Sequence, residues 1–155
     1  MPGVLVILGS KSDLEVGQKA VATLKKFGVG ARIVVASAHR TPERVKRLVE
    51  ESDAEVFIAV AGLAAALPGT IASFTVKPVI GVPVSGKVNL DSILSIVQMP
   101  PGIPVAAVGV DRGENAALLA VQMLAINDAR LKQELLKHRK EMAEQVEKDS
   151  DEVSG

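Results

Sequence analysis

The sequence predicts an α/β protein with one five-stranded parallel sheet, helices on both of its faces, and a separate C-terminal tail helix. Two observations lead to this prediction. Short aliphatic runs alternate along the chain with segments that have helical spacing. The first run, residues 4–8, is apolar throughout, which is typical of a strand buried on both faces. With 155 residues, of which 48% are hydrophobic, the chain is long enough to bury one sizeable core.

Five strands are expected, at residues 4–8, 31–35, 56–60, 78–82 and 104–108. Each is short and rich in β-branched or other aliphatic residues, and the first ends at Gly9. Right-handed crossovers between five such strands make a flavodoxin-like doubly wound order the simplest arrangement. Residues 1–127 are therefore predicted to form one flavodoxin-like domain, a three-layer sandwich, with residues 128–155 as a C-terminal extension.

Helical segments fill the gaps between these strands. The first, residues 14–27, has apolar residues on one side and lysines on the other, and it stops at Gly28. The next opens at Thr41-Pro42, with Thr41 as the N-cap. A short helix is expected within residues 69–75, another from Asp91 through Val97, and an Ala- and Leu-rich helix over residues 115–126.

A charged tail follows these elements. Residues 128–148 are strongly charged, yet Leu131, Leu135, Met142 and Val146 keep an apolar stripe at helical spacing. This tail helix is not followed by a further strand, and the other helices already cover both faces of the sheet. We expect it to pack on another face or on another subunit.

Composition excludes several classes of function. Lys and Arg number 18 and Asp and Glu 18, so the net charge of +0 argues against nucleic acid or a membrane surface as a main partner. The absence of cysteine excludes disulfides, thiolate catalysis and Cys-ligated metals. Only two histidines are present, so no metal site is expected. The chain shows no targeting segment and no run of about 20 apolar residues, which predicts a cytoplasmic protein.

Polar loops follow the first three predicted strands, and the carboxyl ends of parallel strands meet at one edge of a sheet. The first loop is GSKSD, residues 9–13. Its amides at a helix start, with the hydroxyls of Ser10 and Ser12, are suited to an anion, and Asp13 is suited to accept from sugar hydroxyls. Alternatively, Ser12 with Glu15 forms only a capping box, although that leaves Asp13 and the second serine unexplained.

The second loop is SAHR, residues 37–40. Arg40 is suited to grip a phosphate, and Ser37 lies beside it as a further candidate for substrate binding. Histidine as a residue type has a reference pKa of about 6.5, so His39 is a candidate for proton transfer near neutrality. A lone histidine is more often structural, but its position at a strand end beside two other polar loops favours catalysis.

The third loop, residues 62–69, has no charged or hydroxyl side chain from Gly62 to Gly69. It is either a tight turn packed by small residues or a dry wall that a ligand approaches closely. Gly62 and Leu67 are its candidate ligand-binding residues.

Taken together, GSKSD, SAHRTP, AALPG, GVPV and SIVQMPPGIPV resemble a purine-pathway family. It comprises the N5-carboxyaminoimidazole ribonucleotide mutases and the aminoimidazole ribonucleotide carboxylases. The resemblance implies a flavodoxin-like catalytic domain, a homo-octamer with tail helices that reach neighbouring subunits, and no ATP, metal or biotin. It implies a ribonucleotide monophosphate substrate held by Ser10, Asp13 and Arg40, carbon dioxide as the second reactant, and His39 as the acid/base.

One position departs from the family pattern. Mutases usually have AAHLPG in the third loop, whereas this chain has Ala66 where the histidine stands. The carboxylase branch usually has Ala there, but it also has a polar stretch before it and Lys where this chain has Arg40. The resemblance therefore favours a mutase, an isomerase, with direct carboxylation of aminoimidazole ribonucleotide, a lyase reaction, as the alternative.

A non-enzymatic phosphoacceptor or binding module on the same fold is the alternative of another class. A receiver module needs an Asp at the end of the third strand, where this chain has Ala61-Gly62. A flavodoxin needs aromatic loops over its flavin, and the chain contains no Trp and no Tyr. The sequence therefore disfavours both a receiver module and a flavodoxin.

Overall fold

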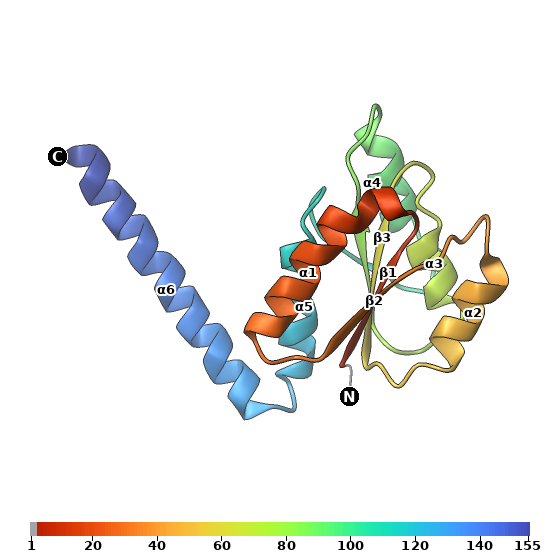
Figure 1. The fold of residues 1–155 in the computed structure, drawn as a ribbon, viewed down its shortest axis with the longest axis horizontal. Helices are drawn as coiled ribbons and strands as arrows, with labels where there is room; N and C mark the ends of the chain where they lie inside the picture. The colour runs from red at the N-terminus through yellow and green to blue at the C-terminus, as the bar shows by residue number, and fades with distance from the viewer. Residues whose placement is uncertain (1–2) are drawn as a thin grey trace. The chain divides into compact units, whose positions relative to one another are not determined.

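The computed structural model describes residues 3–155 and contains a five-stranded parallel sheet (Figure 1). The strands are β1 (Val4–Leu8), β2 (Ala31–Val35), β3 (Val56–Ala61), β4 (Val79–Pro83) and β5 (Ala106–Ala107). Their spatial order is β2-β1-β3-β4-β5, and every pair is parallel. The predicted flavodoxin-like order is confirmed.

The strands β1, β3 and β4 are buried along their whole length. Successive side chains of a strand point to opposite faces of the sheet. Leu5 and Ile7 belong to a core cluster with residues of α2, α3 and α4, while Leu8 faces Gly17 of α1 on the other side. The continuous apolar runs in the sequence reflect this burial on both faces.

The helices form the two outer layers (Figure 1). A short 3-10 turn, η1 (Lys11–Asp13), leads into α1 (Leu14–Lys26), and α5 (Gly113–Leu124) begins beside α1. The opposite layer contains α2 (Pro42–Glu50), α3 (Leu67–Ala72) and α4 (Asn89–Val97). A Cβ on Gly113 would overlap the backbone carbonyl of Val16, so α5 can start this close to α1 only because the residue is glycine.

Two helix starts differ from the sequence predictions. Helix α3 begins at Leu67 rather than near residue 69, because Pro68 fits the first turn of a helix. Helix α4 begins at Asn89 with Val88 as its N-cap, so Asp91 lies inside the first turn and is not the cap. Helix α2 starts as predicted, with Thr41 as the N-cap residue and Pro42 in the first turn, although the Thr41 hydroxyl bonds to Ser37 and not to a helix N–H.

The fifth strand is shorter than the predicted run of residues 104–108. It pairs with β4 only at Ile80↔Ala106 and Gly81↔Ala107. The approach to β5 includes Pro100, Pro101 and Pro104, and a proline has no N–H to donate to a ladder. Such a segment is tolerated at an edge strand, which is the place β5 has in the sheet.

The tail forms one long helix, α6 (Ala129–Ser154). Asp128 is its N-cap, and the side chain accepts from the Leu131 N–H at 3.1 Å. The helix continues past residue 148, where the predicted segment ends, and intrahelical bonds such as Ser154 Oγ to the Ser150 carbonyl occur in its last turn. Within the described residues, the chain separates into two compact units, residues 3–120 and 121–155. None of the helices in residues 3–155 is both long and apolar enough to cross a bilayer.

Candidate active site

The two polar loops and the small-residue third loop line one pocket of about 570 Å³ at the carboxyl edge of the sheet. The predicted residues that line it are His39, Ser10, Ser12, Asp13, Ser37, Arg40, Gly62 and Leu67. The structure therefore brings all the sequence-predicted site residues to one cavity. Its volume is of the size that holds small ligands.

The first loop is organised by a capping box that differs from the one considered in the sequence. Ser10 is the N-cap of η1, and its Oγ accepts from the Ser12 N–H at 3.4 Å. In return, Asp13 Oδ2 accepts from the Ser10 N–H at 3.1 Å. The Ser12–Glu15 pairing is therefore wrong, and so is the argument that capping leaves Asp13 unexplained: Ser10 and Asp13 are themselves the capping pair.

Asp13 is buried, with 6% of its surface exposed. Burial raises the pKa of its carboxyl above the ordinary value of 3.8, although the Ser10 hydrogen bond and the charge of Arg40 act in the opposite direction. The carboxylate is thus a partly desolvated acceptor at the pocket wall, next to a cation. Such an oxygen is suited to accept hydrogen bonds from hydroxyl groups of a ligand.

The second loop is a compact turn between β2 and α2. The Thr41 N–H donates to the Ser37 carbonyl at 2.9 Å, and the Ser37 N–H donates to Thr41 Oγ1 at 2.9 Å. This turn leaves His39 exposed on the wall of the pocket. The local hydrogen bonds therefore present the imidazole to a ligand without covering it.

Arg40 connects the second loop to the first. Its Nη2 donates to the Gly9 carbonyl at 3.0 Å, and its Nε donates to Ser37 Oγ at 3.3 Å. Both contacts are on exposed groups, so the guanidinium stays open to a ligand from the solvent side. A fixed guanidinium beside the amides of η1 is a suitable arrangement for an anion.

The third loop begins with a tight turn. The Ala65 N–H donates to the Gly62 carbonyl at 3.0 Å. Leu63 and Ala65 have positive φ angles of 50° and 23°, which non-glycine residues rarely adopt. Ala65 and Leu67 are buried, so the loop is anchored in the core while Leu63 is exposed. The wall that it gives the pocket is apolar, as the sequence predicts.

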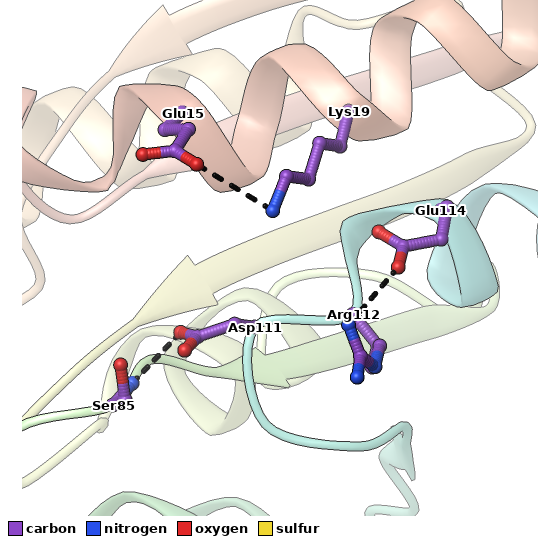
Figure 2. Close-up of polar contacts among 6 residues, drawn as sticks. All are labelled: Glu15, Lys19, Ser85, Asp111, Arg112 and Glu114. Atoms are coloured by element: carbon purple, nitrogen blue, oxygen red, sulfur yellow. Dashed lines mark hydrogen bonds and ion pairs between the residues drawn. The ribbon is translucent and has the colours of Figure 1, made fainter.

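Sequence reasoning missed Asp111 and Ser85, which follow β5 and β4 (Figure 2). Asp111 Oδ1 accepts from the Ser85 N–H at 2.8 Å. Burial would raise the pKa of Asp111, but the Ser85 hydrogen bonds and the charges of Lys19 and Arg112 hold it below 3.8. The signal that could have indicated a turn is the DRG tripeptide: Asp111 has a φ of 59°, which aspartate tolerates better than most residues.

The Asp111–Ser85 bond bears on the pocket through the end of β4. Val84 precedes Ser85, and its Cβ lies 3.6 Å from the position of a Cβ built on Gly62. Ion pairs at 3.5 Å flank the bond, Lys19 with Glu15 and Arg112 with Glu114 (Figure 2). Asp111 thus holds the segment that backs the third loop.

We expect ligand affinity to depend on the protonation of Asp13. Its folded pKa is raised, so the carboxylate is lost at a higher pH than for an ordinary aspartate as the pH falls. If the ionised form accepts from a ligand hydroxyl, binding of a ribose phosphate ligand should weaken as the pH falls through this raised pKa. Calorimetric titrations from about pH 7.5 to 4.5 measure this dependence, since the ordinary carboxyl pKa lies near 4.

The matched control is Asp13→Asn, which keeps an acceptor oxygen for the Ser10 N–H but does not titrate. Every other group of the protein and of the ligand is the same in both experiments, so the difference between the two curves isolates Asp13. Parallel curves for the wild type and the variant would contradict the assignment.

The fold and the pocket define a doubly wound α/β protein with a polar ligand pocket beyond the carboxyl ends of its strands. Comparison with known proteins gives the particular family. The AIR carboxylase family model matches residues 3–145, and the chain belongs to this family. The resemblance inferred from the sequence motifs is confirmed.

Curated relatives and a solved structure agree with this assignment. The chain is 57% identical to the N5-carboxyaminoimidazole ribonucleotide mutase of Methanocaldococcus jannaschii over 144 residues, which is 92% of each chain. It is 53% identical to the Pyrococcus abyssi mutase over 147 residues, covering 92% of this chain and 84% of the relative. The crystal structure of Treponema denticola PurE superimposes with a TM-score of 0.89 and 30% identity, covering 98% of both chains.

Proposed function

We propose that this protein converts N5-carboxyaminoimidazole ribonucleotide into 4-carboxy-5-aminoimidazole ribonucleotide, an isomerase reaction of purine biosynthesis. The proposal depends on one observation above all: His39, Arg40 and the Ser10–Asp13 turn share a pocket with an apolar loop, in a chain similar over 92% of its length to enzymes named for this reaction. The expectation of a cytoplasmic enzyme is part of the same proposal.

Binding is assigned to the first two loops. The phosphate would lie against Arg40 and the amides of η1, and Ser10, Ser12 and Ser37 would offer hydroxyls to it. Asp13 would accept from the ribose. Phosphate binding at a distance from the reacting carbon positions the imidazole ring, and that lowers the entropic part of the barrier. Gly62 and Leu67 would then border the ring on the apolar side.

The reaction needs one proton donor and one proton acceptor. The bond between the exocyclic nitrogen and the carboxyl carbon breaks, the nitrogen takes a proton, and neutral carbon dioxide is released into the pocket. The adjacent ring carbon then attacks carbon dioxide and loses its proton. His39 can give the first proton and take back the second, so a single imidazole balances the cycle. This assignment requires no cofactor.

Direct carboxylation of aminoimidazole ribonucleotide is the second candidate, and Ala66 favours it. Ala66 replaces a histidine with a methyl group on the pocket wall, which suits neutral carbon dioxide as well as a carbamate. We expect measurable carboxylation at high bicarbonate, with the carbamate still preferred at low bicarbonate.

The deciding assay supplies the purified protein with the carbamate substrate in isotope-labelled bicarbonate. A mutase forms mostly unlabelled product faster than the carbamate decomposes in solution. If product formed only after the carbamate had decomposed, and if the product were then fully labelled, the enzyme would be a carboxylase.

The tail helix is proposed as a subunit contact in a homo-oligomer, with an octamer as the expected assembly. Met142 and Val146 are exposed apolar residues on α6, in line with the predicted stripe. Deleting residues 127–155 should reduce the number of subunits per assembly measured by light scattering, because it removes this stripe. A truncated protein that kept its full number of subunits would contradict the contact. Met142→Glu with Val146→Glu in the whole chain gives the same test without truncation.

A further inference from the structure

Leu63 occupies a conformation that costs a leucine more than a glycine. It is the second residue of the turn closed by the Ala65 N–H and the Gly62 carbonyl at 3.0 Å, and its φ is 50°. In the left-handed region the Cβ of an L-residue crowds the backbone, and glycine avoids this cost. The presence of a leucine in this strained conformation indicates that its side chain has a functional role.

That use is not packing within the described part of the chain. Leu63 is 81% exposed, whereas Ala65 is 3% exposed and Leu67 is 2% exposed. The turn is therefore anchored on its C-terminal side, in the core, and it projects the Leu63 side chain toward solvent. No burial within residues 3–155 offsets the strain.

Leu63 lies instead on the wall of the ligand pocket, which it lines together with His39 and Asp13. From Ala61 to Ala66 it is the only side chain larger than a methyl group. It is both exposed and part of the pocket lining, so it lies at the border between the cavity and solvent. The apolar wall of the pocket is therefore formed by small residues, with Leu63 as the one bulky apolar side chain at its edge.

We propose that Leu63 is the residue that retains carbon dioxide in the pocket between bond breaking and bond making. This inference rests on the proposed mutase function. Once the carbon–nitrogen bond has broken, carbon dioxide is neutral and offers little to hydrogen-bond donors, so a steric barrier has to hold it. A branched apolar side chain at the pocket edge supplies such a barrier and also keeps water away. Escape and recapture then compete, and the Leu63 side chain sets their ratio.

The test measures escape directly. Unlabelled carbamate substrate is supplied in ¹³C-bicarbonate with carbonic anhydrase, so that any carbon dioxide that leaves the enzyme is replaced by labelled carbon. Mass spectrometry gives the labelled fraction of the product, and chromatography gives the aminoimidazole ribonucleotide released. Rates without enzyme are subtracted, because the carbamate decomposes in solution.

Leu63→Gly removes the barrier and relieves the backbone, so its melting temperature should be unchanged or higher. We expect the labelled fraction and the released ribonucleotide to rise at least about threefold, while the carbamate is consumed within about threefold of the wild-type rate. Leu63→Met should remain close to the wild type, and Leu63→Ala should be intermediate. Leu94→Ala is the matched control, because Leu94 is an exposed leucine, 47% accessible, on α4.

The outcomes separate this inference from the proposed function. Normal carbamate consumption by Leu63→Gly with a wild-type labelled fraction would overturn the role of Leu63 and leave the mutase intact. Loss of consumption in both Leu63→Gly and Leu63→Ala would assign Leu63 to substrate binding and would also overturn it. Full labelling of the product by the wild type would show that the enzyme is not a mutase.

Discussion

Replacing His39 with asparagine is expected to lower turnover at least ~100-fold, the lower end of the usual contribution of a general acid/base. Asparagine keeps a polar side chain of similar size, but it cannot donate and accept a proton in turn. His39 is exposed on the pocket wall, so the substitution leaves the core unchanged. Steady-state rates with the carbamate substrate give the loss in kcat, and thermal unfolding verifies the fold.

The chain offers its own control for this experiment. His138 is the only other histidine, and it belongs to α6 and is not among the residues that line the pocket. His138→Asn should retain turnover. Product affinity should change little in His39→Asn, because the imidazole is assigned to proton transfer and not to holding the ribonucleotide. Near-normal turnover by a folded His39→Asn protein would remove His39 from the mechanism.

Replacing Arg40 with alanine is expected to weaken ribonucleotide binding by about 1.5–3 kcal/mol, the range for a hydrogen bond to a charged group. At 1.4 kcal/mol per factor of ten, this is an increase in Kd of about 10- to 150-fold. The variant loses the cation beside the η1 amides and also the bonds to the Gly9 carbonyl and Ser37 Oγ. Arg40→Lys keeps the positive charge but loses the planar, two-pronged guanidinium. Its affinity for the ribonucleotide should therefore lie between those of the wild type and Arg40→Ala.

The assignment to phosphate is tested with the dephosphorylated nucleoside. The wild type should bind the nucleotide more tightly than the nucleoside, and this difference should shrink in Arg40→Ala. Arg44→Ala is the matched control: Arg44 also donates to a strand carbonyl, that of Val35 at 3.1 Å, but it does not line the pocket. Equal binding of nucleotide and nucleoside by the wild type would show that Arg40 has another role.

Much of the fold could be predicted from local patterns. The continuous apolar runs predict β1 with its exact ends and β3 to within one residue, because a strand buried on both faces excludes polar residues. The ends of β2 were also predicted, although this edge strand contains Arg32 and is only partly buried. The alternation with helical segments then leaves few topologies, since parallel strands need right-handed crossovers. The carboxyl ends of parallel strands meet at one edge of a sheet, so GSKSD, SAHR and the small-residue loop share an edge, which makes His39 and Arg40 candidate site residues.

Other features depend on contacts that no local pattern carries. Asp111 and Ser85 are 26 residues apart, and their bond follows from the approach of β5 to β4. The capping pair is Ser10 with Asp13, not Ser12 with Glu15. Which pair forms depends on the residue at which the chain leaves β1, and the packing of the sheet determines that residue. The left-handed turn at Leu63 arises because Ala65 and Leu67 are pulled into the core, and only tertiary packing can hold a leucine in that conformation.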